Sequence, residues 1–262
     1  RKEKSMRKYL EIFKFNLKTE LNFKVDYFFS LLSFAVHIFV FNALWDFILQ
    51  DKAILGYTKS QLIWYIIVGE FIAYSIGKKN YLKVSDMIKN GDVANLLTKP
   101  VSFIKYIFAQ EATSIINIVV NFLFGIVFGL VMAGSLELTF LQVLFFIVSI
   151  TISLLIALFV QILIGMLAFI TEENQSFYLI ISKAMLLLIF TPLEFFPQVV
   201  QTILRFLPTT YIIYAPGKIL VDFDVNMALT LVASQVISFL FVYICVYALN
   251  RKGVKNINVN GG

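Results

Sequence analysis

The segment Leu138–Ile170 reads LTFLQVLFFIVSITISLLIALFVQILIGMLAFI, and its 33 residues include no charged side chain. As a helix rising 1.5 Å per residue, this run is about 50 Å long, whereas the hydrocarbon core of a bilayer is roughly 30 Å thick. An uncharged apolar stretch of about 18 residues or more is typical of a transmembrane helix. The segment therefore predicts a bilayer span that tilts or projects into water at its cytoplasmic end.

Further apolar runs accompany this one along the chain. Hydrophobic residues make up 60% of the sequence and charged residues only 15%, whereas soluble domains contain about a quarter charged residues. This composition argues against a soluble globular protein. It predicts one all-α, polytopic transmembrane domain over residues 1–262, with six spanning helices: 27–49, 60–77, 103–133, 138–170, 177–192 and 227–249. The fifth predicted span is short and ends at Pro192.

Lys and Arg are distributed very unevenly between the two sides of these spans. The sparse side carries only Lys52, Lys59, Arg205 and Lys218. The rich side carries the following residues: Arg1, Lys2, Lys4, Arg7, Lys8, Lys14, Lys18, Lys24, Lys78, Lys79, Lys83, Lys89, Lys99, Lys105, Arg251, Lys252 and Lys255. The positive-inside rule then places both termini in the cytoplasm of a multi-pass protein of the cell membrane, which we expect to be a bacterial plasma membrane. Topology also explains the net charge of +6, so we expect no nucleic-acid partner.

Residues 7–22 have the pattern of an amphipathic helix. Tyr9, Phe13, Leu17 and Leu21 recur at four-residue spacing, and charged residues take the opposite side. We predict a helix that lies in the membrane surface with its lysines near anionic lipid headgroups. A simple solvated leader is the alternative.

The loop 78–100, between the second and third spans, is polar with short apolar interruptions. Residues 81–89 predict a brief helix that ends at Gly91, because glycine suits a helix C-cap. Asp92 is then placed to cap a second helical turn over residues 93–97. We expect a bent, structured cytoplasmic loop with an apolar knob at its tip.

The outer segment 193–216 is too apolar for a free loop and too interrupted for a span. Four of the five prolines fall in or next to it: Pro192, Pro197, Pro208 and Pro216. Short helices that re-enter the outer leaflet fit this composition best.

The run Met87–Ser102, MIKNGDVANLLTKPVS, resembles a signature of ABC transporter permeases of the type-2 exporter class. In that family an I-x-x-G-D stretch followed by L-L-x-x-P lies between spans two and three. The outer run that contains Pro192, Glu194 and Pro197 resembles the re-entrant region of the same family. Lys99 departs mildly from the pattern, because many relatives carry arginine there and lysine lacks its bidentate geometry.

The resemblance implies a permease subunit that exports a hydrophobic or amphipathic substrate by alternating access. It implies a second permease subunit, as a homodimer or related heterodimer, and a pair of ATP-binding subunits that dock on a coupling helix. Carried onto this chain, the docking residues are Ile88, Gly91, Asp92, Asn95, Leu96 and Leu97. The sequence contains no G-x-x-x-x-G-K-[ST] stretch, so we expect no cofactor on this chain and no enzymatic activity of its own, with ATP and magnesium bound by the ATPase.

Polar residues inside the predicted spans need a reason, because a charge at the bilayer centre costs about 2.5 to 3.5 kcal/mol on insertion scales. Glu70 is either a carboxylate that lines a pathway or a hydrogen-bonding group that fixes packing. Lys183 can snorkel to the cytoplasmic edge. His37 can titrate, but a lone histidine is more often a hydrogen-bonded packing residue.

The uncharged polar residues of the spans are most simply interhelical hydrogen-bonding groups, and Asn42 and Gln235 belong to this set. Together with Glu70, three of them are our candidates for translocation or gating: Asn117, Asn121 and Gln161. Gly125 and Gly129 form a G-x-x-x-G pattern, which predicts a close helix contact.

Two other function classes remain. An ion- or proton-coupled secondary transporter would need coupling carboxylates, of which Glu70 is the one plausible example, and inverted repeats, which the sequence does not display. An intramembrane enzyme would need converging catalytic groups or metal ligands. With one histidine and one cysteine in the sequence, we predict no metal site.

Overall fold

The computed structural model describes residues 10–17, 24–50, 52–76, 80–98, 102–171 and 173–260. Within these ranges the chain is helical with short connections and no β-strand, which confirms the predicted all-α class. Residues 10–17 form a short helix, and the rest of the predicted surface helix 7–22 lies outside the described residues. The longer helices are α2 (Lys24–Leu49), α3 (Lys59–Ser75), α6 (Phe103–Glu111), α7 (Ile115–Ala133), α8 (Phe140–Met166), α9 (Gln175–Phe190) and α12 (Val225–Asn260).

Five segments are long and apolar enough to cross a membrane: Val25–Leu49, Lys59–Lys89, Phe103–Ala133, Phe140–Phe169 and Val225–Gly253. They overlap the predicted spans one to four and six. The second segment takes in both α3 and the helix Asn80–Lys89, and residues 77–79 between these helices lie outside the described ranges. The predicted fifth span, 177–192, is not confirmed by length. Helix α9 has 16 residues and is about 24 Å long. It ends where Thr191 adopts an extended backbone before Pro192.

The third predicted span, 103–133, is not one continuous α-helix. A 3₁₀ turn, η1 (Ala112–Ser114), separates α6 from α7. The hydroxyl of Thr113 donates a hydrogen bond to the Gln110 carbonyl at 2.8 Å. Side-chain bonds of this kind compete with the helix backbone and bend helices, which the hydropathy of the run does not reveal.

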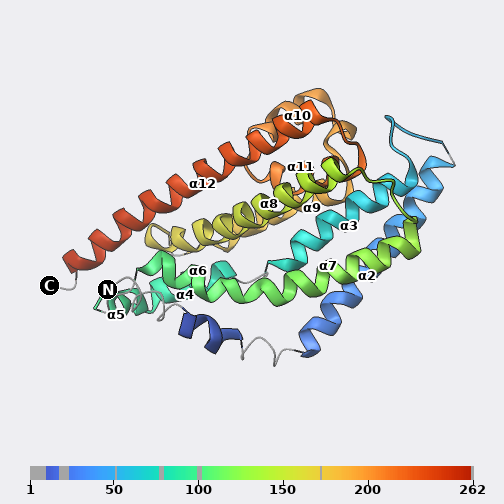
Figure 1. The fold of residues 1–262 in the computed structure, drawn as a ribbon. Coiled ribbons are helices and arrows are strands. Elements are labelled where there is room, and N and C mark those ends of the chain that lie inside the picture. Colours follow the sequence, from blue (N-terminus) through green and yellow to red (C-terminus); the bar gives the residue numbers. More distant parts are fainter. Residues whose placement is uncertain are drawn as a thin grey trace.

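The long helices run alongside one another as an elongated bundle (Figure 1). Helix α3 lies in the centre and packs against α2, α7, α9 and α11, while α8 packs against α11 and α12. Nearly all of α3 is buried, whereas α2, α7 and α12 expose most of their apolar side chains. Apolar surface of this extent suits lipid or another membrane-embedded subunit.

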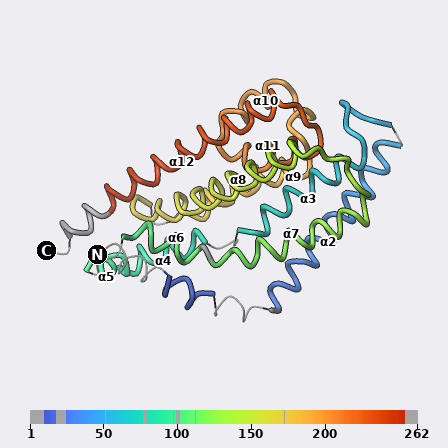
Figure 2. The backbone as a smooth tube through the Cα atoms, in the orientation of Figure 1, coloured from blue at the N-terminus to red at the C-terminus, as the bar shows by residue number. Residues whose placement is uncertain are grey.

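Short elements gather at the two ends of the bundle. Helices α4 (Asn80–Lys89) and α5 (Asp92–Leu97), the helical residues 10–17 and the C-terminal part of α12 lie at one end. We call this the elbow end, after the bend between α4 and α5. Helix α10 (Gln198–Arg205) and the loop between α2 and α3 lie toward the other end, as the tube in Figure 2 also shows.

The proline-rich segment forms three short helices, η3 (Leu193–Phe195), α10 and α11 (Thr210–Val221). Short helices were predicted here, but the predicted boundary at Pro216 is wrong. Helix α11 continues through Pro216 to Val221 and is buried along its whole length, against α3 and α8. A proline removes one backbone hydrogen bond of a helix, and burial between two long helices holds α11 together.

The G-x-x-x-G pattern marks a real helix contact, between α7 and α3. A Cβ atom built on Gly129 would lie 2.6 Å from the Trp64 ring. The indole Nε1 of Trp64 also donates a hydrogen bond to the Gly134 carbonyl at 2.9 Å. Glycine at 129 therefore lets the end of the indole ring approach α7 closely, as the spacing predicts.

Gln235 confirms the prediction of an interhelical hydrogen-bonding group. It is fully buried, and its amide Nε2 donates to the Ser153 hydroxyl at 2.8 Å and to the Tyr211 carbonyl at 3.1 Å. Its Oε1 accepts from the Ser149 hydroxyl at 2.9 Å. One side chain of α12 thus ties together α8 and α11.

Candidate functional site

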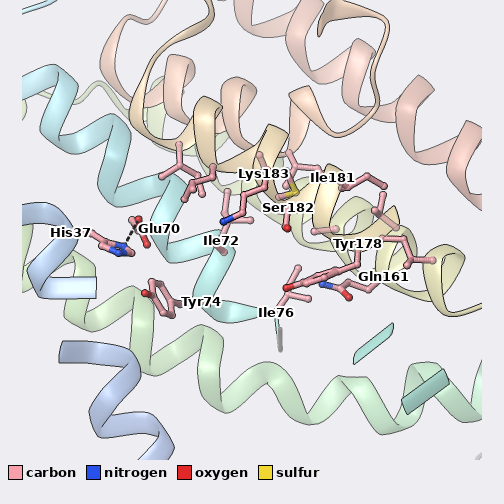
Figure 3. Close-up of a pocket in the computed structure, with 18 residues that line it drawn as sticks. His37, Glu70, Ile72, Tyr74, Ile76, Gln161, Tyr178, Ile181, Ser182 and Lys183 are labelled. Atoms are coloured by element: carbon pink, nitrogen blue, oxygen red, sulfur yellow. Dashed lines mark hydrogen bonds and ion pairs between the residues drawn. The ribbon is translucent and has the colours of Figure 1, made fainter. Parts of the chain in front are cut away.

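A cavity of about 280 Å³ lies between α3, α8 and α9, with His37 of α2 at one end. Figure 3 shows its lining. Two of the predicted candidates, Glu70 and Gln161, lie in it, together with His37, Tyr178 and Lys183. The cavity arises because α9 packs on α3 and α11 but scarcely on α8, and only Leu188 and Ile189 of α9 are buried. The elbow-end half of α9 therefore stands away from α8.

Glu70 and His37 form a pair at one end of the cavity. The imidazole Nδ1 lies 2.9 Å from Glu70 Oε1, and the Glu70 side chain is only 2% exposed. A carboxylate this deeply buried needs a hydrogen-bonding partner, and His37 supplies one across α2 and α3. This contact joins α2 to α3, and Glu70 lines the cavity with one carboxylate oxygen engaged by His37.

Lys183 does not reach for the edge of the bundle as the snorkelling prediction expects. Its side chain extends from α9 toward α3 and lies between the His37–Glu70 pair and Tyr178 (Figure 3). Within the part of the chain that the structure describes, its amine makes neither a hydrogen bond nor an ion pair. Lys183 is thus the one charged cavity residue, among those described, whose charge is not engaged.

The other predicted pathway residues do not join this cavity. Asn121 is buried in α7, and its amide donates to the Asn117 carbonyl of the same helix at 2.8 Å. Asn117 is half-buried on that helix. Gln161, in contrast, accepts a hydrogen bond from the backbone N–H of Tyr81 at 3.3 Å, which confirms an interhelical contact between α8 and α4. The structure thus brings together two of the four candidates.

A second polar cluster, at the opposite end from the elbow, centres on Lys218 of α11. Its amine donates to Tyr57 Oη at 2.7 Å, to Glu194 Oε1 at 3.0 Å and to Asp222 Oδ2 at 2.7 Å. The hydroxyl of Tyr214 donates to the same Glu194 oxygen at 2.8 Å. We call these five residues the outer cluster. An ammonium has three donors, and here each has an acceptor.

The cluster shifts the titration of its members. Burial alone would raise the pKa of Glu194, but hydrogen bonds and the charge of Lys218 outweigh it, so this pKa is lowered. Burial would lower the pKa of Lys218, yet its bonds to Asp222 and Glu194 raise it. Burial and the Glu194 charge raise the pKa of Tyr57. At neutral pH Glu194 is therefore a carboxylate, Lys218 is an ammonium, and Tyr57 and Tyr214 are neutral phenols.

Glu194 was predicted only as part of the re-entrant segment, and the cluster around it was not foreseen. The prolines predicted with it serve as helix boundaries for the most part. Pro192 precedes η3, Pro197 precedes α10, and Pro208 lies in the turn before α11, whereas Pro216 is inside α11.

Helix α4 packs against α8 and α9, which form two walls of the cavity. A Cβ on Gly165 of α8 would lie 2.5 Å from Val84 Cβ, so glycine permits this close approach. The Ser85 hydroxyl donates to Asn174 Oδ1 at 3.4 Å. The rings of Tyr81 and Tyr178 stack with their centroids 4.3 Å apart. Helix α4 therefore contacts both α8 and α9.

The bend between α4 and α5 depends on Gly91, whose φ is +77°. Glycine adopts this left-handed conformation at little cost. The prediction that Asp92 caps the second helix is wrong, because Gly91 occupies the N-cap position with no side-chain hydrogen bond and Asp92 is the first residue of α5. Its charge still suits the positive end of the helix dipole.

The predicted docking residues differ in accessibility. Gly91, Asp92 and Asn95 are exposed, whereas Ile88 and Leu96 are half-buried against the core. The side chain of Leu97 lies outside the described residues. The accessible face of the elbow is therefore mostly polar, and Leu96 does not form the exposed apolar knob that the sequence suggests.

No group of three or more histidine, cysteine, aspartate or glutamate side chains able to hold a metal ion occurs within the described ranges.

A family model described as "ABC-2 family transporter protein" matches residues 31–261 of the chain. No curated protein matches it. The matched region includes the cavity, the elbow and the outer cluster.

Proposed function

The chain belongs to the ABC-2 family of transporter proteins, and on that premise we propose that it is the transmembrane permease subunit of an ATP-driven exporter. It is a multi-pass membrane protein with several apolar helices. In our proposal a second permease subunit completes the transmembrane unit, and a pair of ATP-binding subunits supplies ATP and magnesium. The substrate is a hydrophobic or amphipathic molecule, which suits a cavity of mainly apolar lining.

The proposed topology has six crossings with both termini in the cytoplasm. Helix α9 begins beside α4 at the elbow end and is followed by Glu194 of the outer cluster, so it runs between the two ends despite its length. Lys83, Lys89 and Lys105 lie around the elbow, which supports its cytoplasmic location. The plasma membrane is the proposed location.

The two peripheral elements fit this topology. Helical residues 10–17 expose Leu10 and Phe15, which suits a helix at the inner membrane surface. Helix α10 exposes Val199 and Ile203, and Phe206 follows it. Apolar side chains at that end suit contact of the predicted re-entrant segment with the outer leaflet.

The observation that carries the proposal is the attachment of α4 to the cavity. Because Val84 packs on Gly165 of α8, and Tyr81 stacks on Tyr178 of α9, a push on the elbow would displace two walls of the cavity at once. Packed interiors transmit such displacements because they are dense and little compressible. ATP-driven closure of the docked subunits would thus move α8 and α9, and the cavity would open alternately inward and outward.

The test is copurification of an ATP-hydrolysing subunit with the full chain. We expect Asp92→Arg with Asn95→Arg to remove it, because both residues are exposed and lie three positions apart on one face of α5. Glu137→Arg, an equally exposed acid elsewhere in the chain, is the control and should leave copurification unchanged. Full copurification with the double variant, or substrate transport driven by a proton gradient in ATP-depleted vesicles, would contradict the proposal.

A further inference from the structure

The cavity between α3, α8 and α9 combines an apolar wall with one unengaged positive charge. Three ionisable cavity residues matter: His37, Glu70 and Lys183. His37 and Glu70 are bound to each other at 2.9 Å. Lys183 has neither a hydrogen bond nor an ion pair in the described part of the chain.

The direction of the Lys183 side chain differs from that of a lysine that snorkels to the cytoplasmic edge. It lies eight positions after Gln175, the first residue of α9, which is about 12 Å along the helix. Instead of pointing back to the elbow end, its amine points into the cavity toward α3 (Figure 3). Lys183 is exposed in the isolated chain. Under the proposed topology its ammonium lies at membrane depth, where an uncompensated charge is costly and commonly marks a substrate pathway.

The remaining lining suits the rest of an amphipathic molecule. Uncharged polar side chains that line the cavity include Gln161, Tyr178 and Ser182 (Figure 3). The apolar contributors include Ile72, Ile76, Val160, Ile164, Met185 and Ile189. A volume of about 280 Å³ is at the lower end of ordinary ligand pockets. It holds a headgroup and part of one alkyl chain, and the open side along α9 leaves room for the remainder.

We propose that this cavity binds an anionic amphiphile, whose carboxylate or phosphate is held by Lys183 and whose alkyl chain lies along the apolar wall. The inference rests on the proposed function, since it names the substrate class of the exporter. A cationic amphiphile finds no free acid here, because Glu70 is 2% exposed and engaged by His37. A neutral one would leave the ammonium uncompensated.

The experiment measures binding to the full chain, purified with the subunits that accompany it, in nanodiscs of zwitterionic lipid. Four probes of equal chain length are compared: dodecanoate, dodecyl phosphate, dodecanol and dodecylammonium. We expect one or both anions to bind about tenfold or more tighter than the neutral and cationic probes. The two anionic arms distinguish a fatty-acid carboxylate from a phosphate monoester.

Variants test whether Lys183 causes the tighter binding of the anionic probes. Lys183→Met should abolish it, Lys183→Arg should restore it, and Lys183→Glu should favour dodecylammonium instead. Ala73→Phe places a bulky ring in the cavity lining and should weaken binding of every probe. Lys105→Met, which removes another exposed lysine outside the cavity, is the control and should change nothing. Thermal unfolding of each variant checks that the fold is retained.

Equal binding of the four probes, or an anion preference that survives Lys183→Met, overturns the inference. Loss of subunit assembly in Lys183→Met with unchanged probe binding also overturns it, because Lys183 would then pair with another subunit. These outcomes are separate from the proposed function. ATPase copurification that depends on Asp92 and Asn95 would stand even if no probe bound, and anion binding could persist without any copurified ATPase.

Discussion

Lys218 Nζ donates a hydrogen bond to Tyr57 Oη at 2.7 Å across a sequence separation of 161 positions. The ammonium also lies 4.6 Å from the centre of the Tyr57 ring, within the range of a cation–π interaction. Since Lys218 also holds Glu194 and Asp222, one side chain fastens α11, η3 and the loop between α2 and α3. The end of the bundle opposite the elbow is thereby closed around a buried charge.

Replacing Lys218 should therefore destabilise the protein strongly. In Lys218→Met, Glu194 loses its cation while it remains mostly buried, and such uncompensated buried charges cost about 3 to 5 kcal/mol. The free energy of unfolding, followed by thermal denaturation in detergent, should fall by that order. Lys59→Met is the matched control, since Lys59 pairs with Asp46 at 2.8 Å on the surface and should cost less than about 1 kcal/mol. Equal losses in the two variants would refute the central role of Lys218.

The same cluster predicts how stability depends on pH. The pKa of Glu194 is lowered from its ordinary value of 4.5, so its contribution is complete above that value and is lost as pH falls through the lowered pKa. The pKa of Lys218 is raised from 10.5, so its contribution is complete below 10.5 and disappears as pH rises through the raised pKa. Thermal stability should be flat between these limits. Glu194→Gln should lower the thermal stability between these limits and reduce the loss of stability at acid pH. An unchanged loss at acid pH would show that other carboxyl groups cause that loss.

Local sequence patterns predicted the features that depend on neighbouring residues. Five spans follow from uninterrupted hydropathy, and the bend at Gly91 follows from glycine between two short helical segments. The contact at Gly129 follows from small residues four positions apart. Each of these signals lies within one turn or one helix, so periodicity and turn chemistry are enough to predict it.

Features that depend on tertiary packing were missed or wrong. The contact between Tyr57 and Lys218 joins elements that are distant in sequence, and no local pattern pairs them. Hydropathy could not show that Lys183 turns toward α3, because that direction depends on how far α9 stands from α8. The continuation of α11 past Pro216 depends on burial, which overrides local propensity.

The helix contact at Gly129 gives a graded packing test. Gly129→Ala should destabilise the protein by about 1 to 3 kcal/mol, because the new Cβ would lie 2.6 Å from the Trp64 ring. Gly125→Ala, one turn away, should cost less, since its Cβ would meet the flexible Ile67 side chain at 3.3 Å. Thermal unfolding measures both. Combining Gly129→Ala with Trp64→Leu should recover part of the loss, and no recovery would mean that the ring is not the obstacle.

The bend at Gly91 gives a test that separates backbone geometry from side-chain contact. A Cβ at this position would meet nothing within 4 Å, so a substitution acts only through its φ of +77°. A left-handed residue with a Cβ costs roughly 1 to 2 kcal/mol, and asparagine tolerates this conformation better than alanine. We expect Gly91→Ala to turn α5 and reduce ATPase copurification, and Gly91→Asn to reduce it less.

Gly56→Ala is the matched control for that variant. Gly56 has a φ of +84° and no atom within 4 Å of a built Cβ, but it lies in the loop between α2 and α3, at the far end from the elbow. The strain is therefore comparable, while the location is not. If backbone strain at the elbow reorients the docking face, only the Gly91 variants should lose the ATPase. Equal loss in Gly56→Ala would show that general destabilisation is responsible, and the bend would then have no specific part in coupling.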